Sequence, residues 1–511
     1  MSLKMSLSRW LPPVLLAAVL LAALYVVVAV HAAGETLLAG TILVIAALAA
    51  WIYSSSKAYA YRYLFPGIGA ALIFVVFPMV YTMGIGFTNH SSKNLLKFPR
   101  ATQYLIDETH QVEGQSLQFT LHADGAEFRA RFENPETQAA FVSGPLALKN
   151  NNPLELAVEP AENVKIPLGE PLQLRDLIPR QAALKALTFV TPDGRKLRMT
   201  GLRQFGPVEP LYEPRGDGTL LNKENGDVLT ANFTTGFYEN QRGERIQPGF
   251  QVNVGLDNYR RIFTDSAFRE PFIRIFVWTV MFSALTVFFA AALGMLLAVL
   301  FNWDALKFKG VYRIMLFLPY AVPGFISILV FKGLFNNNFG EINLILHALF
   351  GIKPAWFSDP TLAKIMLLIV NVWLGYPYMM VVCMGLIKAI PADLYEASAV
   401  AGAGPLVNFF RITLPLILKP LTPLLISAFA FNFNNFVLIA LLTGGRPDFI
   451  DTSVPAGTTD LLVSYTYRIA FQDSGQQFGL AAAISTVIFA MVAVISLVQM
   501  RFTKIAREEA R

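Results

Sequence analysis

The chain has 511 residues, of which 54% are hydrophobic and 15% charged, with a net charge of +6 and a mean hydropathy of +0.49. Because soluble domains usually carry about 25% charged residues, this composition excludes a soluble enzyme, a disordered chain and a small disulfide-linked scaffold. The single cysteine, Cys383, leaves no intrachain disulfide possible. A protein that crosses a membrane several times is the class that fits.

The charge is unevenly distributed along the chain. Residues 88–271 contain 21 of the 41 basic residues and 23 of the 35 acidic ones, a net charge of −2, and the rest of the chain carries +8. The basic residues outside this segment lie in short loops between apolar stretches, where they set orientation in the membrane. The positive charge therefore gives no indication of nucleic-acid binding.

Apolar stretches long enough to cross a membrane recur along the chain. A helix needs about 20 mostly apolar residues to span the hydrocarbon core. The sequence predicts eight such helices, at residues 11–30, 37–53, 64–87, 272–301, 313–335, 362–387, 420–443 and 478–500. The distribution of Lys and Arg among the loops places both termini in the cytoplasm and residues 88–271 outside.

The domain organisation follows from these spans. The prediction is an all-α polytopic membrane protein with one β-rich external insertion. Residues 1–63 form the N-terminal tail and the first two helices, 64–87 the third helix, 88–271 the external domain, and 272–511 a core with helices four to eight.

The external segment reads as a domain built of short strands. Gln118–Leu121 and Ala186–Val190 are typical strand sequences, and turn signals such as Asp124-Gly125 separate them. Its length is sufficient for one hydrophobic core. Docking of a partner protein is the predicted role, and a structural cap is the alternative.

Several kinds of chemistry have no motif in this sequence. It contains no GxxxxGK(S/T) phosphate loop, no HExxH and no pair of cysteines, so we predict no catalytic residues, no metal site and no cofactor in this chain. The predicted spans also lack the mid-membrane carboxylates that ion-coupled carriers use. Any energy for transport is therefore expected from another subunit.

The loop between the sixth and seventh helices, residues 391–415, has a helix–turn–helix pattern. A short helix from Asp393 to about Ala401 should end at Gly402, because glycine tolerates positive φ, and Pro405 should begin the next helix. Such a unit on the membrane surface could dock into a partner, or it could be a plain connector.

Polar and aromatic residues interrupt the later apolar spans. Asn371, Gly375 and Tyr378 recur at helical spacing in the sixth span, and Asn432 and Asn435 share a predicted face of the seventh. In the fifth, Pro319 and Pro323 flank Tyr320 and should break the helix. Interhelical hydrogen bonding is one explanation. An uncharged sugar site is the other, since amides pair with hydroxyls and rings stack on sugar faces.

The 391–415 loop resembles the EAA coupling loop of ABC importer permeases. The spacing fits throughout, with Ser398 in place of an alanine and Ala401 in place of an aspartate that many members have. The resemblance implies a type I importer permease in which an ATPase subunit contacts this loop. The residues that would make the coupling are Glu396, Ala397, Ser398, Gly402, Ala403, Gly404 and Pro415.

Over nearly its full length the chain is similar to the larger permease subunits of bacterial maltose/maltodextrin ABC importers. The sequence segments on which this resemblance rests include residues 318–323, 353–360, 371–378 and 429–436. The family resemblance implies uptake of maltose and maltodextrins by alternating access. The implied sugar contacts are Tyr320, Asn371, Leu374, Gly375, Tyr378, Phe431, Asn432 and Asn435, and Gly324 stands where the family pattern has serine.

The same resemblance implies the location and the partners. The chain would lie in the bacterial inner membrane with residues 88–271 in the periplasm. Its partners would be a second permease subunit, an ATPase homodimer that binds ATP and Mg, and a periplasmic maltose-binding protein.

Three alternatives remain from the sequence. A permease for another oligosaccharide, such as a glucoside or trehalose, would use the same residue types. An ion-coupled sugar carrier would need a charged group in the pathway. A membrane-bound enzyme acting on glycans would need a pair of carboxylates in residues 88–271, where no motif marks one.

Overall fold

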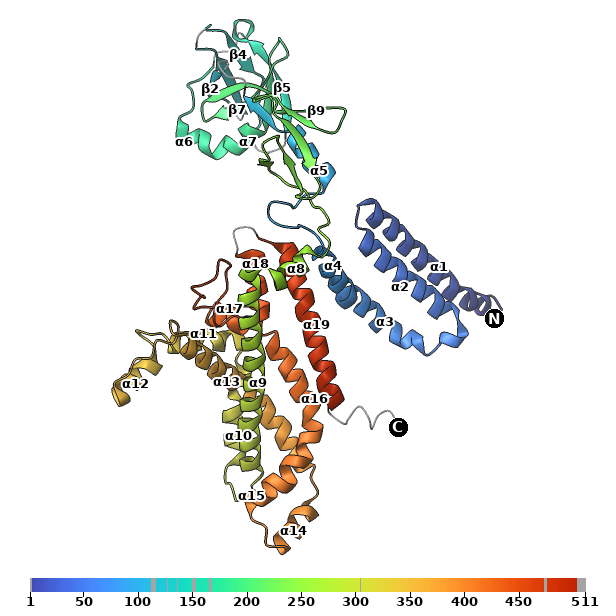
Figure 1. Cartoon of the computed structure of the whole chain (residues 1–511). Helices are drawn as coiled ribbons and strands as arrows, with labels where there is room; N and C mark the ends of the chain where they lie inside the picture. Colours follow the sequence, from blue (N-terminus) through green and yellow to red (C-terminus); the bar gives the residue numbers. More distant parts are fainter. Residues whose placement is uncertain are drawn as a thin grey trace. The chain divides into compact units, whose positions relative to one another are not determined.

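The computed structural model describes residues 2–111, 116–125, 127–135, 137–148, 153–164, 168–303, 305–472 and 476–502. The chain forms two compact units (Figure 1). The first combines 1–92 with 253–511 and is helical, and the second, Lys93–Val252, is rich in strands. The predicted insertion, 88–271, is longer than the second unit, because residues 88–92 and 253–271 belong to the helical unit.

The N-terminal part of the helical unit consists of consecutive apolar helices. They are α1 (Ser2–Ala32), α2 (Thr36–Ser54), η1 (Ser56–Ala58), α3 (Tyr61–Ala71), the π-helical η2 (Leu72–Val76) and α4 (Phe77–Ile85). The turn between α2 and α3 is fixed by Arg62, whose guanidinium donates to the carbonyls of Ile52 (3.2 Å) and Tyr53 (2.9 Å). The run from Tyr61 to Ile85 is one 25-residue candidate span.

The remaining helices of this unit follow the second unit in sequence. They are α8 (Asp257–Thr264), α9 (Ser266–Asn302), α10 (Lys309–Phe317), η5 (Leu318–Ala321), α11 (Gly324–Leu334), α12 (Glu341–Phe350), α13 (Pro360–Lys388), α14 (Ala392–Val400), α15 (Pro405–Asn408), the π-helical η6 (Phe409–Thr413), α16 (Leu414–Phe433), α17 (Phe436–Leu442), α18 (Leu462–Phe471) and α19 (Phe478–Phe502).

The predicted membrane spans are confirmed in number. In the part of the chain that the structure describes, seven helices are long and apolar enough to cross a membrane, and a bent pair makes eight if it counts as one span. That pair, 309–321 and 324–334, bends by 93°. The break lies at Pro323, whose ring removes a backbone donor and disfavours helix at the residue before it. The predicted interruption of the fifth span is therefore present.

The seventh span differs from the prediction. It covers Pro405–Phe433 instead of 420–443. The helix stops at Phe433, and the side chain of Asn435 accepts a hydrogen bond from the amide of Leu438 (3.3 Å), which caps α17. Hydropathy did not indicate this end, because apolar residues continue on both sides of the two asparagines.

Helices α9 and α13 cross with their backbones close together at Gly294. A β-carbon added there would lie 2.7 Å from Met379 Cβ and 2.7 Å from the Met380 amide nitrogen. Small residues permit such close crossings in membrane bundles.

Gly294→Ala is therefore expected to destabilise the protein by about 1–3 kcal/mol, since the added methyl forces two packed backbones apart. Gly385→Ala, on α13 with open space around the added carbon, is the matched control and should be neutral or slightly stabilising. The midpoint of thermal unfolding of the purified protein in detergent measures both. Equal midpoints for the two variants would contradict the close crossing.

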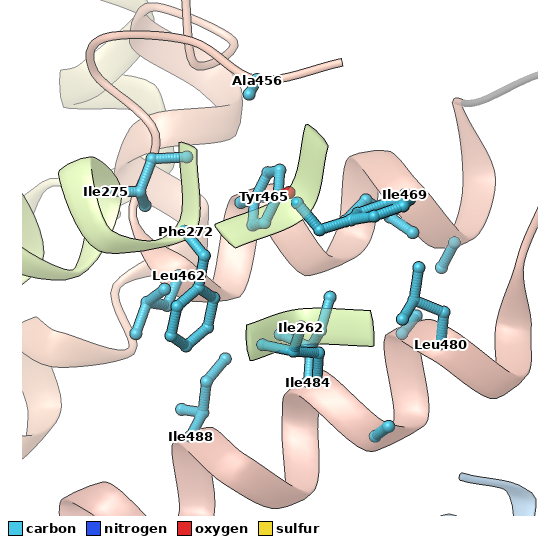
Figure 2. Packing of buried hydrophobic residues seen from close by; sticks show 14 of the residues in the cluster. Ile262, Phe272, Ile275, Ala456, Leu462, Tyr465, Ile469, Leu480, Ile484 and Ile488 are labelled. Carbon is cyan, nitrogen blue, oxygen red and sulfur yellow. The ribbon is translucent and has the colours of Figure 1, made fainter. Parts of the chain in front are cut away.

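Buried apolar side chains hold α8, α9, α18 and α19 together. Figure 2 shows this cluster, in which Ile262 and Phe272 face residues of the two C-terminal helices. The labelled members are Ile262, Phe272, Ile275, Ala456, Leu462, Tyr465, Ile469, Leu480, Ile484 and Ile488. Ala456 belongs to the loop between α17 and α18, so the cluster also anchors that loop.

A buried ion network supports the same loop. Arg468 donates to Asp460 (2.8 Å) and to Asp448 (2.7 Å). Asp460, with no exposed side-chain surface, also accepts from the hydroxyl of Ser464 and the amide of Gly457, each at 2.8 Å. The carboxylate is thus fully satisfied, as burial of a charge requires.

Arg468→Met is expected to cost about 3–5 kcal/mol, because it leaves a buried carboxylate without its cation. Arg274→Met is the control, since that arginine pairs with Asp451 at the surface, where both side chains are about half exposed, and such pairs are worth about 1 kcal/mol or less. Thermal unfolding in detergent tests the difference. A loss of about 1 kcal/mol or less in both variants would show that the network does not stabilise the loop.

The second unit contains an eight-stranded sheet that closes on itself. Its strands are β1 (Thr109–Gln111), β2 (Leu117–Asp124), β3 (Glu127–Glu133), β4 (Ala140–Ser143), β5 (Leu154–Pro160), β6 (Leu187–Val190), β7 (Lys196–Gly201) and β8 (Gln204–Pro210). Because β8 pairs with both β7 and β2, the pairings from β2 to β8 form a closed ring, in which β5 and β6 alone are parallel. Phe119, Phe132, Phe189 and Phe205 contact one another in its core.

A second, antiparallel sheet completes this unit. It consists of β9 (Tyr212–Pro214), β10 (Leu220–Asn222), β11 (Val228–Asn232), β12 (Phe237–Glu239) and β13 (Arg245–Ile246). The helical segments here are α5 (Phe98–Ile106), η3 (Ala161–Asn163), α6 (Leu174–Leu177), η4 (Ile178–Arg180) and α7 (Gln181–Ala186). The predicted β-rich domain is thereby confirmed, with both predicted strand segments lying almost entirely in β2 and β6.

Candidate functional site

The predicted sugar contacts lie on three elements of the helical unit and at the cap of a fourth. Asn371, Leu374, Gly375 and Tyr378 are on α13, Tyr320 is in η5, Phe431 and Asn432 are at the end of α16, and Asn435 precedes α17. The prediction that Asn432 and Asn435 share the face of one helix is wrong, because α16 ends between them.

The three asparagines nevertheless meet, and Asn371 is the centre of their contacts. Its Nδ2 donates to Asn432 Oδ1 (2.7 Å) and to Thr286 Oγ1 (3.2 Å), and its Oδ1 accepts from Asn435 Nδ2 (3.2 Å). Asn371 and Asn432 are buried. We call Asn371, Asn432, Asn435 and Thr286 the amide cluster; it links α9 to α13, α16 and the start of α17.

Sequence reasoning missed Thr286, which is buried on α9. The sequence did contain an indication of this polar position. Thr279, Ser283 and Thr286 recur at helical spacing, which places three hydroxyls on one face of an otherwise apolar helix. All three are buried, and Thr279 Oγ1 accepts from the amide of Leu462 (3.1 Å). A repeated hydroxyl at this spacing therefore marks the polar face of α9.

The aromatic rings among the predicted sugar contacts are exposed. The exposed fractions are 51% for Tyr320, 40% for Tyr378 and 72% for Phe431. The Tyr320 ring stacks on Phe317 with centroids 5.4 Å apart. These rings are exposed, whereas the amides of the cluster are already paired with one another.

The other predicted positions serve packing or leave space. Gly375 lies against α9, where an added β-carbon would be 3.4 Å from Ala290 Cβ, and a β-carbon at Gly324 would meet no atom within 4 Å. Leu374 packs on the edge of a buried cluster. The open space at Gly324 is compatible with the serine of the family pattern.

The loop from 391 to 415 has the predicted helix–turn–helix form. Its first helix, α14, ends with Gly402 at φ +77°. The amide of Gly402 donates to Ala399 O (2.9 Å) and that of Ala403 to Ser398 O (3.0 Å). These are the two bonds of a Schellman ending, which requires a residue in the left-handed conformation.

Two side-chain pairs join the halves of this loop. Ser398 Oγ donates to Asn408 Oδ1, and the hydroxyls of Tyr395 and Thr413 lie 2.9 Å apart. The departure from the family pattern at Ser398 thus contributes a hydrogen bond. Gly404 follows with an ordinary extended conformation, and Pro415 lies in the first turn of α16.

Much of the exposed surface of the loop is apolar, although Asp393 and Arg411 are exposed as well. Glu396 and Ala397 are exposed, and Glu396 has no ion pair among the residues described. The exposed apolar side chains around them include Leu394, Val400, Leu406, Val407 and Phe410, of which Val400 is 91% exposed. Such a patch is typical of a protein contact surface.

No group of three or more potential metal ligands occurs in the described ranges. A surface pocket of about 370 Å³ lies in the strand-rich unit, lined by residues of β11 and β12 such as Asn232 and Glu239. It is remote in sequence from the amide cluster and contains none of the predicted site residues.

Comparison with known proteins covers most of the chain. Residues 10–57 match the family model of the MalF N-terminal region with its transmembrane helices, 96–255 that of the maltose transport system permease protein MalF P2 domain, and 290–506 that of the binding-protein-dependent transport system inner membrane component.

Curated relatives named maltose/maltodextrin transport system permease protein MalF match almost end to end. Those of Escherichia coli strain K12 and Klebsiella aerogenes are each 52% identical over 487 residues, covering 94% of this chain and 94% of the relative. That of Vibrio cholerae serotype O1 is 50% identical over 492 residues, covering 95% of this chain and 93% of the relative. The chain therefore belongs to the MalF family of maltose/maltodextrin transport system permease proteins, inner membrane components of binding-protein-dependent transport systems.

Proposed function

We propose that the chain is the permease subunit of an ATP-driven importer that takes up maltose and maltodextrins by alternating access. The observation that carries this proposal is identity of about 50% with named maltose permeases over more than nine-tenths of both chains. The seven candidate spans, or eight with the bent pair, and the uncharged polar cluster that joins several of their helices support it.

The sugar site is proposed at the amide cluster and the nearby rings. Amides both donate and accept hydrogen bonds, so sugar hydroxyls can take the place of the bonds that Asn371 makes with Asn432 and Asn435. Exposed rings such as Tyr378 offer the apolar faces on which sugars stack. Tyr320, Leu374, Gly375 and Phe431 would complete the contacts.

Coupling to ATP hydrolysis is proposed through the 391–415 loop. Its apolar surface around Glu396 would dock on an ATPase subunit. The loop joins α13, which carries Asn371, directly to the 405–433 helix, which carries Asn432. Because hydrogen bonds hold the two halves of the loop together, movement of the loop would act on both helices at once and alter the amide cluster between them.

The proposed partners follow from the family. They are a second permease subunit, an ATPase homodimer that binds ATP and Mg, and a periplasmic maltose-binding protein that contacts the domain within residues 88–271. This chain would hydrolyse nothing itself. Its termini would lie in the cytoplasm, in accordance with the distribution of basic residues.

Uptake driven by ATP distinguishes this proposal from an ion-coupled carrier. The four components are reconstituted in proteoliposomes with ATP on the ATPase side, and radiolabelled maltose is supplied with the binding protein. We expect accumulation that survives collapse of all ion gradients by ionophores and stops without ATP. Accumulation that needs an ion gradient and no ATP would contradict the proposal.

A further inference from the structure

Helix α12 lies between two candidate spans but cannot cross a membrane itself. Its ten residues extend about 15 Å at 1.5 Å per residue, half the thickness of the hydrocarbon core. It precedes α13, and the coupling loop follows the other end of that 29-residue helix. Because α13 is long enough to cross the membrane, α12 belongs to the membrane face opposite the coupling loop.

One side of α12 is fixed to the rest of the unit. Asn343 is buried, and its amide donates to the carbonyls of Asn337 (3.1 Å) and Pro354 (3.0 Å). The indole of Trp356 donates to Asn343 Oδ1 (2.8 Å). Ile342 and Leu346 pack on the cluster that includes Trp356. The helix is thus held in one orientation about its axis.

The opposite side of α12 is apolar and uncovered. Leu344, Ile345 and Leu349 are exposed by 53%, 56% and 69%, and Ala348 lies among them on the same face. The flanking apolar residues Phe339, Phe350 and Ile352 are also more than half exposed. Glu341 is the charged residue on this side, and it stands at the helix N-terminus, where an acidic group is favourable.

We infer that α12 is an interfacial anchor whose exposed face lies in the lipid headgroup region of the bilayer. Short helices with one apolar face typically bury that face roughly 5–10 Å below the headgroup boundary. Continuity with the spans on both sides brings this face to the edge of the hydrocarbon core. Lys353, exposed just after the helix, is placed to meet lipid phosphates.

We propose that lipid, and not a protein, covers the exposed face of α12, because α12 lies between two membrane-spanning segments. In sequence α12 lies between α11 and α13, which must themselves meet the bilayer. The centre of its exposed face, from Leu344 to Leu349, is apolar, and the exposed His347 lies at the edge of that face. An apolar face of this size in water would be unfavourable.

Spin-label accessibility tests this in the assembled transporter. Ile345→Cys and Leu349→Cys are made in a Cys383→Ala background, labelled, and reconstituted with the partner subunits in nanodiscs. Val19→Cys on α1 serves as the lipid control and Asp217→Cys in the strand-rich unit as the water control. We expect the two α12 labels to relax at least threefold faster with oxygen than the water control, and to be shielded from a water-soluble nickel reagent.

Two results would overturn the inference. High accessibility to the nickel reagent, as at Asp217→Cys, would place the face in water. Low accessibility to both reagents would mean that protein covers it. If the labelled variants fail to assemble, the wild-type transporter is tested in nanodiscs that contain lipids with a photoactivatable acyl chain. We expect peptides from residues 339–352 to carry lipid adducts after illumination. Absence of these adducts would contradict the proposed anchor.

Discussion

Gly402→Val is expected to lower sugar uptake at least tenfold while the chain remains in the membrane. Gly402 has φ +77°, a conformation that costs an ordinary L-residue about 1–2 kcal/mol and a β-branched one more. The end of α14 would have to rearrange, and the hydrogen bonds that hold the two halves of the loop together would be lost. A loss of 1.4 kcal/mol already corresponds to a factor of about ten.

Gly351→Val is the matched control for this experiment. Gly351 also ends a helix in the left-handed conformation, with φ +71°, but it lies outside the 391–415 loop. An added β-carbon at either glycine meets no atom within 4 Å, so the valine introduces the same backbone strain at both positions. Uptake and ATP hydrolysis are measured for both in proteoliposomes. Equal uptake by the two variants would show that the geometry of the α14 ending is unimportant for coupling.

Asn371→Ala is expected to remove most sugar uptake, by tenfold or more, because it removes the centre of the amide cluster. Three hydrogen bonds disappear at once, and the buried Asn432 loses the donor to its Oδ1. An unsatisfied buried polar group costs about 1–3 kcal/mol. Uptake of labelled maltose is the readout, with stimulation of ATP hydrolysis by the binding protein measured on the same vesicles.

Tyr378→Ala separates sugar contact from helix packing in that result. Tyr378 is 40% exposed and makes no hydrogen bond within the amide cluster, so its loss should reduce uptake with little effect on stability. Ile369→Ala is the control on the same helix, since Ile369 is 45% exposed and lies about 180° around α13 from Tyr378. Normal uptake by Tyr378→Ala, with loss only in Asn371→Ala, would mean that these residues only pack helices.

The predictions for Gly402 and Asn371 depend on the same structural feature, the connection between α13 and the 405–433 helix. The loop that contains Gly402 connects the two helices whose asparagines pair at 2.7 Å. A shift of the loop along either helix would therefore change that contact. This connection is the proposed route from ATP hydrolysis to the proposed sugar site.

Much of the helical unit could be predicted from sequence because lipid imposes a simple rule. A span must be apolar over about 20 residues, and its backbone must bond internally. The break at Pro323 and the end of α14 at Gly402 were also predictable, since proline and glycine act on the backbone locally. The end of α16 at Phe433 was not, because the neighbouring sequence is equally apolar.

Contacts between segments that are distant in sequence could not be predicted, for a different reason. The role of Asn371 as the centre of the amide cluster depends on Thr286, 85 residues earlier, and on Asn432, 61 residues later. The network of Asp460, Arg468 and Asp448 and the closure of the sheet by β8 likewise depend on how segments meet in space. Local patterns indicate which residues need a partner, but they do not name the partner.

ATP hydrolysis by the reconstituted transporter tests the central claim most directly. The chain is co-expressed with a second permease and an ATPase, purified, and placed in proteoliposomes with the periplasmic binding protein, with and without maltose. The account predicts strong stimulation of ATP hydrolysis by the maltose-loaded binding protein and little by the empty one or by a binding protein for another sugar. Failure of any ATPase to co-purify, or stimulation that is indifferent to maltose, would contradict it.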